Sequence, residues 1–87
     1  MKVFIKNEVI GKKNVKLAKM LVNDYKAVCN TGVYRLETIE TVGELNKLIK
    51  RVILTLGESS VYPFVTPLDD ALMVNFRQMD IGAMRFK

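Results

Sequence analysis

The hydrophobic pattern of the chain starts with a period of two and changes to a helical period near residue 14. Residues 2–6, KVFIK, fit a period of two, with Val3 and Ile5 on one side and Lys2 and Lys6 on the other, and are rich in β-branched and aromatic types, so they predict a strand. The segment EVI after Asn7 predicts either a bent continuation of this strand or the second arm of a short hairpin, which Gly11 ends.

From residue 14 onward, apolar side chains recur every three to four positions, which indicates an amphipathic helix. Asn14 suits the N-cap, and Asn30 or Gly32 suits the left-handed position after the last turn. The apolar face of this helix holds Val15, Leu17, Ala18, Leu21, Val22, Tyr25, Val28 and Cys29. The opposite face holds Lys16, Lys19, Asn23 and Lys26. On the apolar face, Cys29 is expected to act as a small hydrophobe and not as a reactive thiol.

A second helix carries signals at both ends. It follows residues 33–40, which alternate as a half-buried strand. Thr41 and Glu44 match a capping box, and Gly57 stands where a glycine commonly ends a helix. Between them, one face is apolar and holds Val42, Leu45, Leu48, Ile49, Val52, Ile53 and Leu56. The other face holds Lys47, Lys50 and Arg51.

The last thirty residues admit two interpretations. The two prolines of SVYPFVTP restrict any strand there to a short or edge position. Thr66 as N-cap and Pro67 at the first helical position favour a third helix, whereas residues 72–77 alternate as a strand does. We favour a helical turn at 67–70 followed by a hairpin, with the segment 82–87, GAMRFK, as the partner strand.

These patterns predict a single α+β domain over residues 1–87, in which two amphipathic helices pack on one face of a small, mostly antiparallel sheet. A chain of 87 residues lies at the small end of what folds alone, and 49% hydrophobic residues is an ordinary globular composition. The expected core contains Val3, Ile5, Leu17, Leu21, Val22, Tyr25, Leu36, Leu45, Leu48, Ile49, Val52 and Ile53.

Charge is distributed unevenly along the chain. The formal net charge is +5, and residues 1–26 hold seven lysines against Glu8 and Asp24, whereas the acidic and basic residues of the remainder balance. A one-sided basic surface attracts nucleic acid, acidic protein or anionic lipid. The same charge also suits a protein that it merely keeps in solution.

The residues that most enzymes need are missing. The chain has no histidine and one cysteine, which excludes Ser–His and Cys–His pairs and the common zinc sites. Asp69, Asp70 and Asp80 would hold magnesium only if the fold gathered them, and they are more typical of a helix start and a turn. We therefore expect no enzyme activity, no cofactor and no bound metal. The absence of a signal-peptide pattern, the absence of a membrane-spanning apolar run and the lone Cys29 favour the cytoplasm.

Lysines gather around the start of the first helix, where they oppose the helix dipole. Free amides and nearby lysines suit a phosphate or carboxylate, so we predict a site for nucleic acid or another anion. Its residues are Lys12, Lys13, Lys16, Lys19, Asn23 and Lys26, together with Lys2 and Lys6 of the first strand. A secondary basic patch comprises Lys47, Lys50 and Arg51. Phe4, between Lys2 and Lys6, offers a ring on which a base could stack.

The short basic chain, the start MKVFIK, the two helices between strands and the missing catalytic residues resemble small accessory proteins of tailed phages. Such proteins often bind and block a host enzyme, a defence complex or a toxin, sometimes with RNA. The resemblance covers the style of the whole chain without a specific motif, so it carries over no functional residue.

Two functions follow from the sequence. The first is a non-enzymatic binding protein that contacts RNA or another polyanion, or an acidic protein surface, and inhibits a nucleic-acid-associated host protein such as a toxin or a defence nuclease. The alternative is a protein–protein interaction module or a homo-oligomer without nucleic-acid binding. Its contact surface would be Leu54, the edge strand near residues 62–64, or the methionine-rich C-terminal segment.

Overall fold

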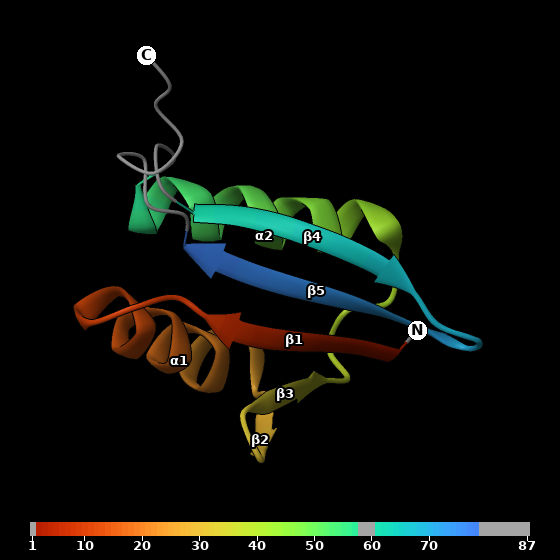
Figure 1. Ribbon diagram of the computed structural model, residues 1–87. Helices are drawn as coiled ribbons and strands as arrows, with labels where there is room; N and C mark the ends of the chain where they lie inside the picture. The colour runs from red at the N-terminus through yellow and green to blue at the C-terminus, as the bar shows by residue number, and fades with distance from the viewer. Residues whose placement is uncertain (1, 58–60, 79–87) are drawn as a thin grey trace.

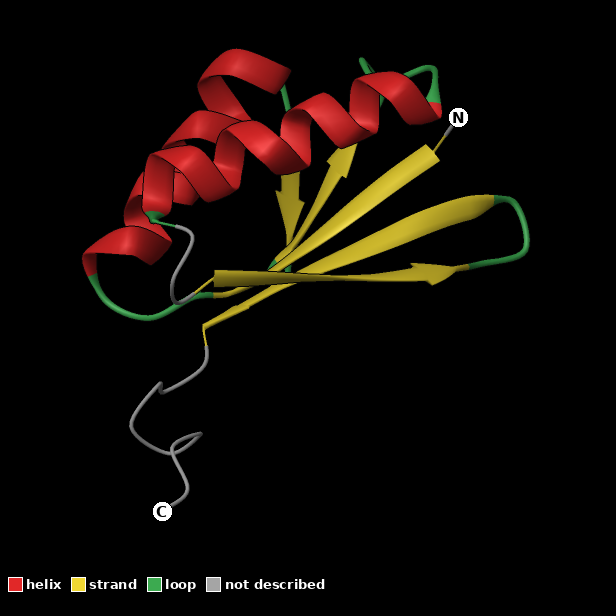
Figure 2. Cartoon of the chain, turned by 90° about the horizontal axis from the view of Figure 1, so that it is seen from above, coloured by secondary structure: helices red, strands yellow, loops and turns green. Residues whose placement is uncertain are grey.

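A computed structural model describes residues 2–57 and 61–78 (Figure 1). In chain order, these residues form β1 (Lys2–Glu8), α1 (Lys12–Tyr25), β2 (Val28–Asn30), β3 (Val33–Leu36), α2 (Val42–Leu56), β4 (Val61–Pro67) and β5 (Ala71–Gln78). The strands of this part of the chain make one five-stranded sheet in the order β2–β3–β1–β5–β4. Figure 2 shows both helices on one face of that sheet, so the predicted α+β architecture is confirmed.

The connections between the strands explain why both helices share a face. Strand β1 pairs antiparallel with β3 and parallel with β5, and the two outer pairings are antiparallel. Each of the crossovers β1–α1–β2 and β3–α2–β4 therefore joins two strands that run parallel to each other. The first strands of the two crossovers, β1 and β3, are antiparallel, and the two crossovers move in opposite directions across the sheet. With the right-handed connection that parallel crossovers adopt almost without exception, both helices must lie on the same side.

The core lies between the helices and the sheet. Its fully buried side chains are Val3, Ile5, Leu17, Leu21, Leu36, Leu45, Leu48, Val52, Val61, Val74 and Phe76. Among the predicted core residues, Tyr25 and Ile49 pack against this core from partly buried positions. The prediction for Val22 is wrong, because this side chain is 45% exposed. The apolar arc of α1 is wider than the stripe that meets the sheet, which is centred on Leu17 and Leu21.

The start of α1 differs from the prediction. Gly11 is the N-cap, with φ of 70° and no side-chain cap bond, so the assignment of Asn14 as N-cap is wrong. Asn14 instead lies in the first turn, where its Nδ2 donates to the carbonyl oxygen of Val9 at 2.8 Å. Its own carbonyl accepts from Nδ2 of Asn7 at 3.0 Å. The two asparagines tie the end of β1 to α1 and leave the helix start without a side-chain cap.

The end of α1 also comes earlier than expected. Lys26, with φ of 57°, takes the left-handed position predicted for Asn30 or Gly32, and the N–H of Ala27 donates to the carbonyl of Leu21 at 3.0 Å. The chain then forms β2, in which Cys29 is exposed, so the prediction that Cys29 is buried on a helix face is wrong. Pairing of β2 with β3 through a two-residue turn replaces the predicted extra helical turn.

The predicted ends of α2 are confirmed. Oγ1 of Thr41 accepts from the N–H of Glu44 at 3.1 Å, and Oε1 of Glu44 accepts from the N–H of Thr41 at 3.1 Å. Together these bonds complete the capping box. Gly57 is the C-cap, and its N–H donates to the carbonyl of Ile53. The strand before α2 is shorter than the predicted 33–40, since β3 ends at Leu36.

The described C-terminal part is a hairpin. Residues 61–67 pair with 71–78, and the N–H of Leu68 donates to the carbonyl of Ala71 at 2.8 Å across the loop. The predicted helical turn at 67–70 is therefore wrong, and the strand interpretation of residues 72–77 holds. Strand β4 is an edge strand, as its prolines indicated, and it takes the partner role given to 82–87, which lie outside the described residues.

Replacing Thr41 with alanine should lower the free energy of unfolding by about 1 kcal/mol, because the N–H of Glu44 loses its acceptor. Urea denaturation at neutral pH measures this change. Thr55→Ala, on the exposed side of the same helix, is the matched control and should not lower the free energy of unfolding, because alanine has the higher helix propensity. Equal losses in both variants would contradict a capping role for Thr41.

The same capping box should make stability depend on pH. The backbone N–H groups of Glu40 and Thr41 donate to Glu44, and these bonds lower the pKa of its carboxyl. The stabilisation is therefore complete above the ordinary glutamate pKa of about 4.3 and is lost as pH falls through the lower folded value. Glutamine at position 44 keeps an acceptor oxygen that does not titrate. In urea melts, wild type should lose stability relative to Glu44→Gln as pH falls below about 4.3, and parallel curves would contradict this.

Candidate polyanion interface

The exposed side of α1 carries a line of lysines. Leu17, Met20 and Leu21 turn toward the core, so the helix presents its other side outward. Lys12, Lys16 and Lys19 are all exposed there, at spacings of four and three residues that align them along the helix. At 1.5 Å per residue, these three positions span about 10 Å of the axis. We call these three residues the α1 lysine stripe.

Within residues 2–57 and 61–78, no ion pair joins the α1 lysine stripe to an acid. The first turn of α1 contains no acidic residue. Across residues 2–57 and 61–78, the ion pairs engage other basic groups: Asp24 pairs with Arg51, and Glu8 pairs with Lys6 and Arg77. The positive charge of the stripe therefore adds to the positive end of the helix dipole.

Lys13 is placed differently from its neighbours. It is only partly exposed, and its Nζ lies 3.7 Å from the position that a Cβ on Gly57 would occupy. Gly57 caps the C-terminus of α2, where carbonyl groups make the helix end partly negative. The Lys13 ammonium thus lies near the partly negative end of α2, where its positive charge is favourable.

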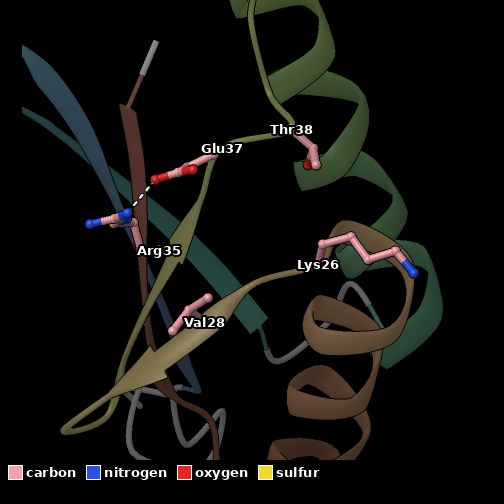
Figure 3. A pocket seen from close by; sticks show the side chains of 5 residues that line it. All are labelled: Lys26, Val28, Arg35, Glu37 and Thr38. Carbon is pink, nitrogen blue, oxygen red and sulfur yellow. Dashed lines mark hydrogen bonds and ion pairs between the residues drawn. The ribbon is translucent and has the colours of Figure 1, made fainter.

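Asn23 and Lys26 continue the basic surface toward the far end of α1. Both are exposed, and Nζ of Lys26 lies 3.5 Å from the carbonyl oxygen of Asn23. Lys26 also borders a hollow between α1 and the β2–β3 hairpin (Figure 3). Figure 3 shows its ammonium directed away from Arg35, which pairs with Glu37 instead. Lys26 therefore belongs to the helix surface and not to the sheet.

The other predicted site lysines lie on the opposite side of the molecule. Val3 and Ile5 of β1 are buried under the helices, so the alternating Lys2 and Lys6 project from the other face of the sheet. Nζ of Lys2 lies 3.6 Å from Asp70, and Nζ of Lys6 lies 3.1 Å from Glu8. The structure thus divides the predicted site into two surfaces: among the described residues, Lys2 and Lys6 pair with acids and the α1 lysine stripe does not.

Arg51, predicted to join a secondary basic patch, connects the two helices. Its Nη2 donates to Asp24 at 2.6 Å, its Nη1 donates to the hydroxyl of Tyr25 at 3.4 Å, and its guanidinium lies 5.7 Å from the centre of that ring. The hydrogen bonds to Tyr25 and then to Asp24 raise the pKa of Arg51. Lys47 and Lys50 remain exposed on α2. The patch therefore offers two lysines to a partner, because Arg51 is engaged.

Sequence reasoning missed two apolar side chains within the basic surface. Val15 is 53% exposed and Val22 is 45% exposed, although the helical projection placed both on the apolar face of the helix. Val15 lines an open hollow together with Lys12, Lys13, Lys16 and Lys19. The available signal was their position at the margin of the apolar arc, seven residues apart and next to lysines.

Comparisons with protein-family models, curated proteins and solved structures found no match for this chain. The described residues contain no group of cysteine, aspartate and glutamate side chains placed to hold a metal ion. Of the proposed magnesium ligands, Asp69 and Asp70 are exposed, and Asp80 lies outside the described part. No helix within that part is long and apolar enough to cross a membrane.

Replacing Lys12 with glutamate should raise the free energy of unfolding by about 0.3–1 kcal/mol, because an acidic side chain in the first turn of α1 favours the helix dipole. Chemical denaturation at low ionic strength measures the change. Lys50→Glu alters the charge equally in the middle of α2 and should have a smaller effect. A decrease in stability for Lys12→Glu would show that this lysine serves the fold.

Proposed function

We propose that this protein is a non-enzymatic binding protein that holds RNA or another polyanion against the α1 lysine stripe. The observation that carries the proposal is the uncompensated charge of Lys12, Lys16 and Lys19 on one side of a helix whose first turn has no acid. These lysines oppose the dipole of their own helix, so helix stability does not account for them. A phosphate group would interact favourably with the lysine ammonium groups and with the positive end of the helix dipole.

The chemistry of this surface favours contact with a nucleic-acid backbone. Its exposed apolar side chains, Val15 and Val22, are aliphatic, and Tyr25 at its far end is partly buried beside Arg51. Lysines contact phosphates without distinguishing bases, whereas base recognition needs hydrogen bonds to base edges or aromatic stacking. Binding through α1 should therefore tolerate sequence changes and depend strongly on salt.

The resemblance to small phage accessory proteins supports a role for such binding. We propose that the protein acts in the cytoplasm and inhibits a nucleic-acid-associated host protein, such as a toxin or a defence nuclease. The α1 lysine stripe would then hold the nucleic acid that the host protein uses and keep it from that protein. An acidic surface of that host protein offers the same charge complementarity.

The double variant Lys16→Gln/Lys19→Gln should weaken binding to a labelled single-stranded RNA of mixed sequence. The slope of log affinity against log salt is negative, and each lost phosphate contact reduces its magnitude by about 0.7. The double variant should therefore reduce the magnitude by about 1.4. Fluorescence anisotropy over a series of salt concentrations measures both quantities. Heparin as competitor should displace the RNA, because the recognised feature is charge.

Lys2→Gln/Lys6→Gln removes the same charge from the opposite face and is the matched control. It should change the salt slope much less, since Lys2 and Lys6 already pair with acids. Equal effects of the two double variants would mean that net charge, and not the α1 surface, governs binding. Absence of any RNA binding by wild type at low salt would refute the proposal for nucleic acid.

A further inference from the structure

One face of the sheet is left uncovered by the described residues. Figure 2 shows both helices on the other face. Because side chains alternate along a strand, the register places Phe4 of β1, Met73 of β5 and Phe64 of β4 on the uncovered side. Phe64 is 44% exposed, although β4 has a buried residue, Val61, on its helix-facing side.

The apolar side chains of this uncovered face lie on three neighbouring strands and form its apolar centre. Phe4 lies opposite Met73 in the parallel register of β1 and β5, and Phe64 lies opposite Asn75, the next residue of β5 on the same face. The guanidinium of Arg77 covers one side of the Phe64 ring at 5.4 Å from its centre. Phe4 and Met73 thus lie side by side on the inner strands β1 and β5, and Phe64 lies diagonally from Met73 on the edge strand β4.

The charges around this centre are nearly balanced, unlike those of α1, since four basic groups face three carboxylates. Lys2 pairs with Asp70, and Lys6 and Arg77 both pair with Glu8, at 3.1–3.6 Å. Arg35, opposite Phe4 on β3, pairs with Glu37. A polyanion would have to compete with these acids, whereas a partner that carries both signs of charge would not. The face therefore fits a protein surface that also carries both acidic and basic groups around apolar side chains.

We infer that the uncovered sheet face packs against the same face of a second copy of this chain. A two-fold arrangement opposes each patch to itself, so a surface with paired acids and bases around an apolar centre complements its own copy. The ion pairs at the rim are exposed and can exchange partners between copies at little cost. Apolar side chains of the two sheets would meet as in a β-sandwich.

The available area is sufficient for such a dimer. Strands spaced about 4.8 Å apart and rising about 3.3 Å per residue give β1, β5, β4 and β3 a flat footprint of about 400 Å². Side chains roughen this surface, so two copies would together bury on the order of 1,000 Å², the lower limit for a specific interface.

The edges of the sheet favour face-to-face packing over strand addition. Strand β4 contains Pro63 and Pro67, which lack the N–H groups that a further strand would need. At the other edge, β2 has three residues. Short and proline-containing edge strands resist pairing with another chain. The uncovered face is therefore the surface through which this sheet can associate.

This inference goes beyond the proposed function and does not rest on it. In the dimer, the α1 surfaces of the two copies would point outward on opposite sides, since each lies across its sheet from the interface. A dimer could then hold two segments of one polyanion, or two molecules, with the gain in affinity that two linked sites provide.

Sedimentation equilibrium of the full chain, treated with nuclease, tests the inference. In about 0.5 M salt, which screens contacts through bound polyanion, we expect a species of twice the 9.9 kDa chain mass. Phe64→Asp should shift this species to the monomer with an unchanged circular dichroism spectrum. Leu54→Asp is the matched control, since Leu54 is 67% exposed on α2, and it should remain dimeric.

A second measurement tests β5, an inner strand of the sheet, with a small substitution in place of a charged one. In a Cys29→Ser background, Met73→Cys should be crosslinked between copies by a bismaleimide of about 10 Å reach, the spacing of packed sheets, whereas Leu54→Cys should not. A monomer at concentrations up to about 100 µM would overturn the inference. So would a dimer that Leu54→Asp dissociates and Phe64→Asp does not, because the interface would then be the helix layer.

Discussion

The alternation of side chains along β1 determines how the whole molecule is arranged. This strand is central in the sheet, with β3 on one side and β5 on the other. Val3 and Ile5 are fully buried on one face, and burial of such side chains contributes about 1.5–3 kcal/mol each. A shift of one residue in its pairing would expose both and bury Lys2 and Lys6 instead. The helices must therefore lie over Val3 and Ile5, and the basic groups of β1 must face away from them.

This arrangement places on opposite sides of the molecule two groups of lysines that the sequence analysis assigned to one site. On the sheet, every basic group discussed above has a carboxylate within reach, because β1, β5 and their loops supply both signs of charge. On α1, the acidic residue is Asp24, at the end of the helix, and it is engaged by Arg51. The net charge of +5 is therefore expressed mainly on the helix layer. Location, more than the amount of charge, distinguishes a polyanion surface from a balanced one.

How much the sequence could predict depended on whether the signals were local. The capping box at Thr41 and the glycine at position 57 act within one turn, so the bounds of α2 follow from the sequence. The ends of α1 do not, because Asn14 is used by Val9 and Cys29 is drawn into a pairing with Tyr34. Likewise, the parallel pairing of β5 with β1 joins segments some 70 residues apart, and no local pattern reports it. For the candidate site, the lysine spacing was visible, but the separation of Lys2 and Lys6 from α1 required the fold.

The two proposals use the same architectural fact in different ways. A sheet with helices on one face buries its apolar side chains there, and a chain of 87 residues has no further described element to cover the other face. Evolution can leave such a face polar, but here it carries Phe4, Met73 and Phe64, and the exposure of their apolar surface to water is unfavourable. Burial against a second copy would remove that exposure and leave the α1 lysine stripes on the outside. Association through the sheet and attraction through the helices would then operate independently, one insensitive to salt and the other governed by it.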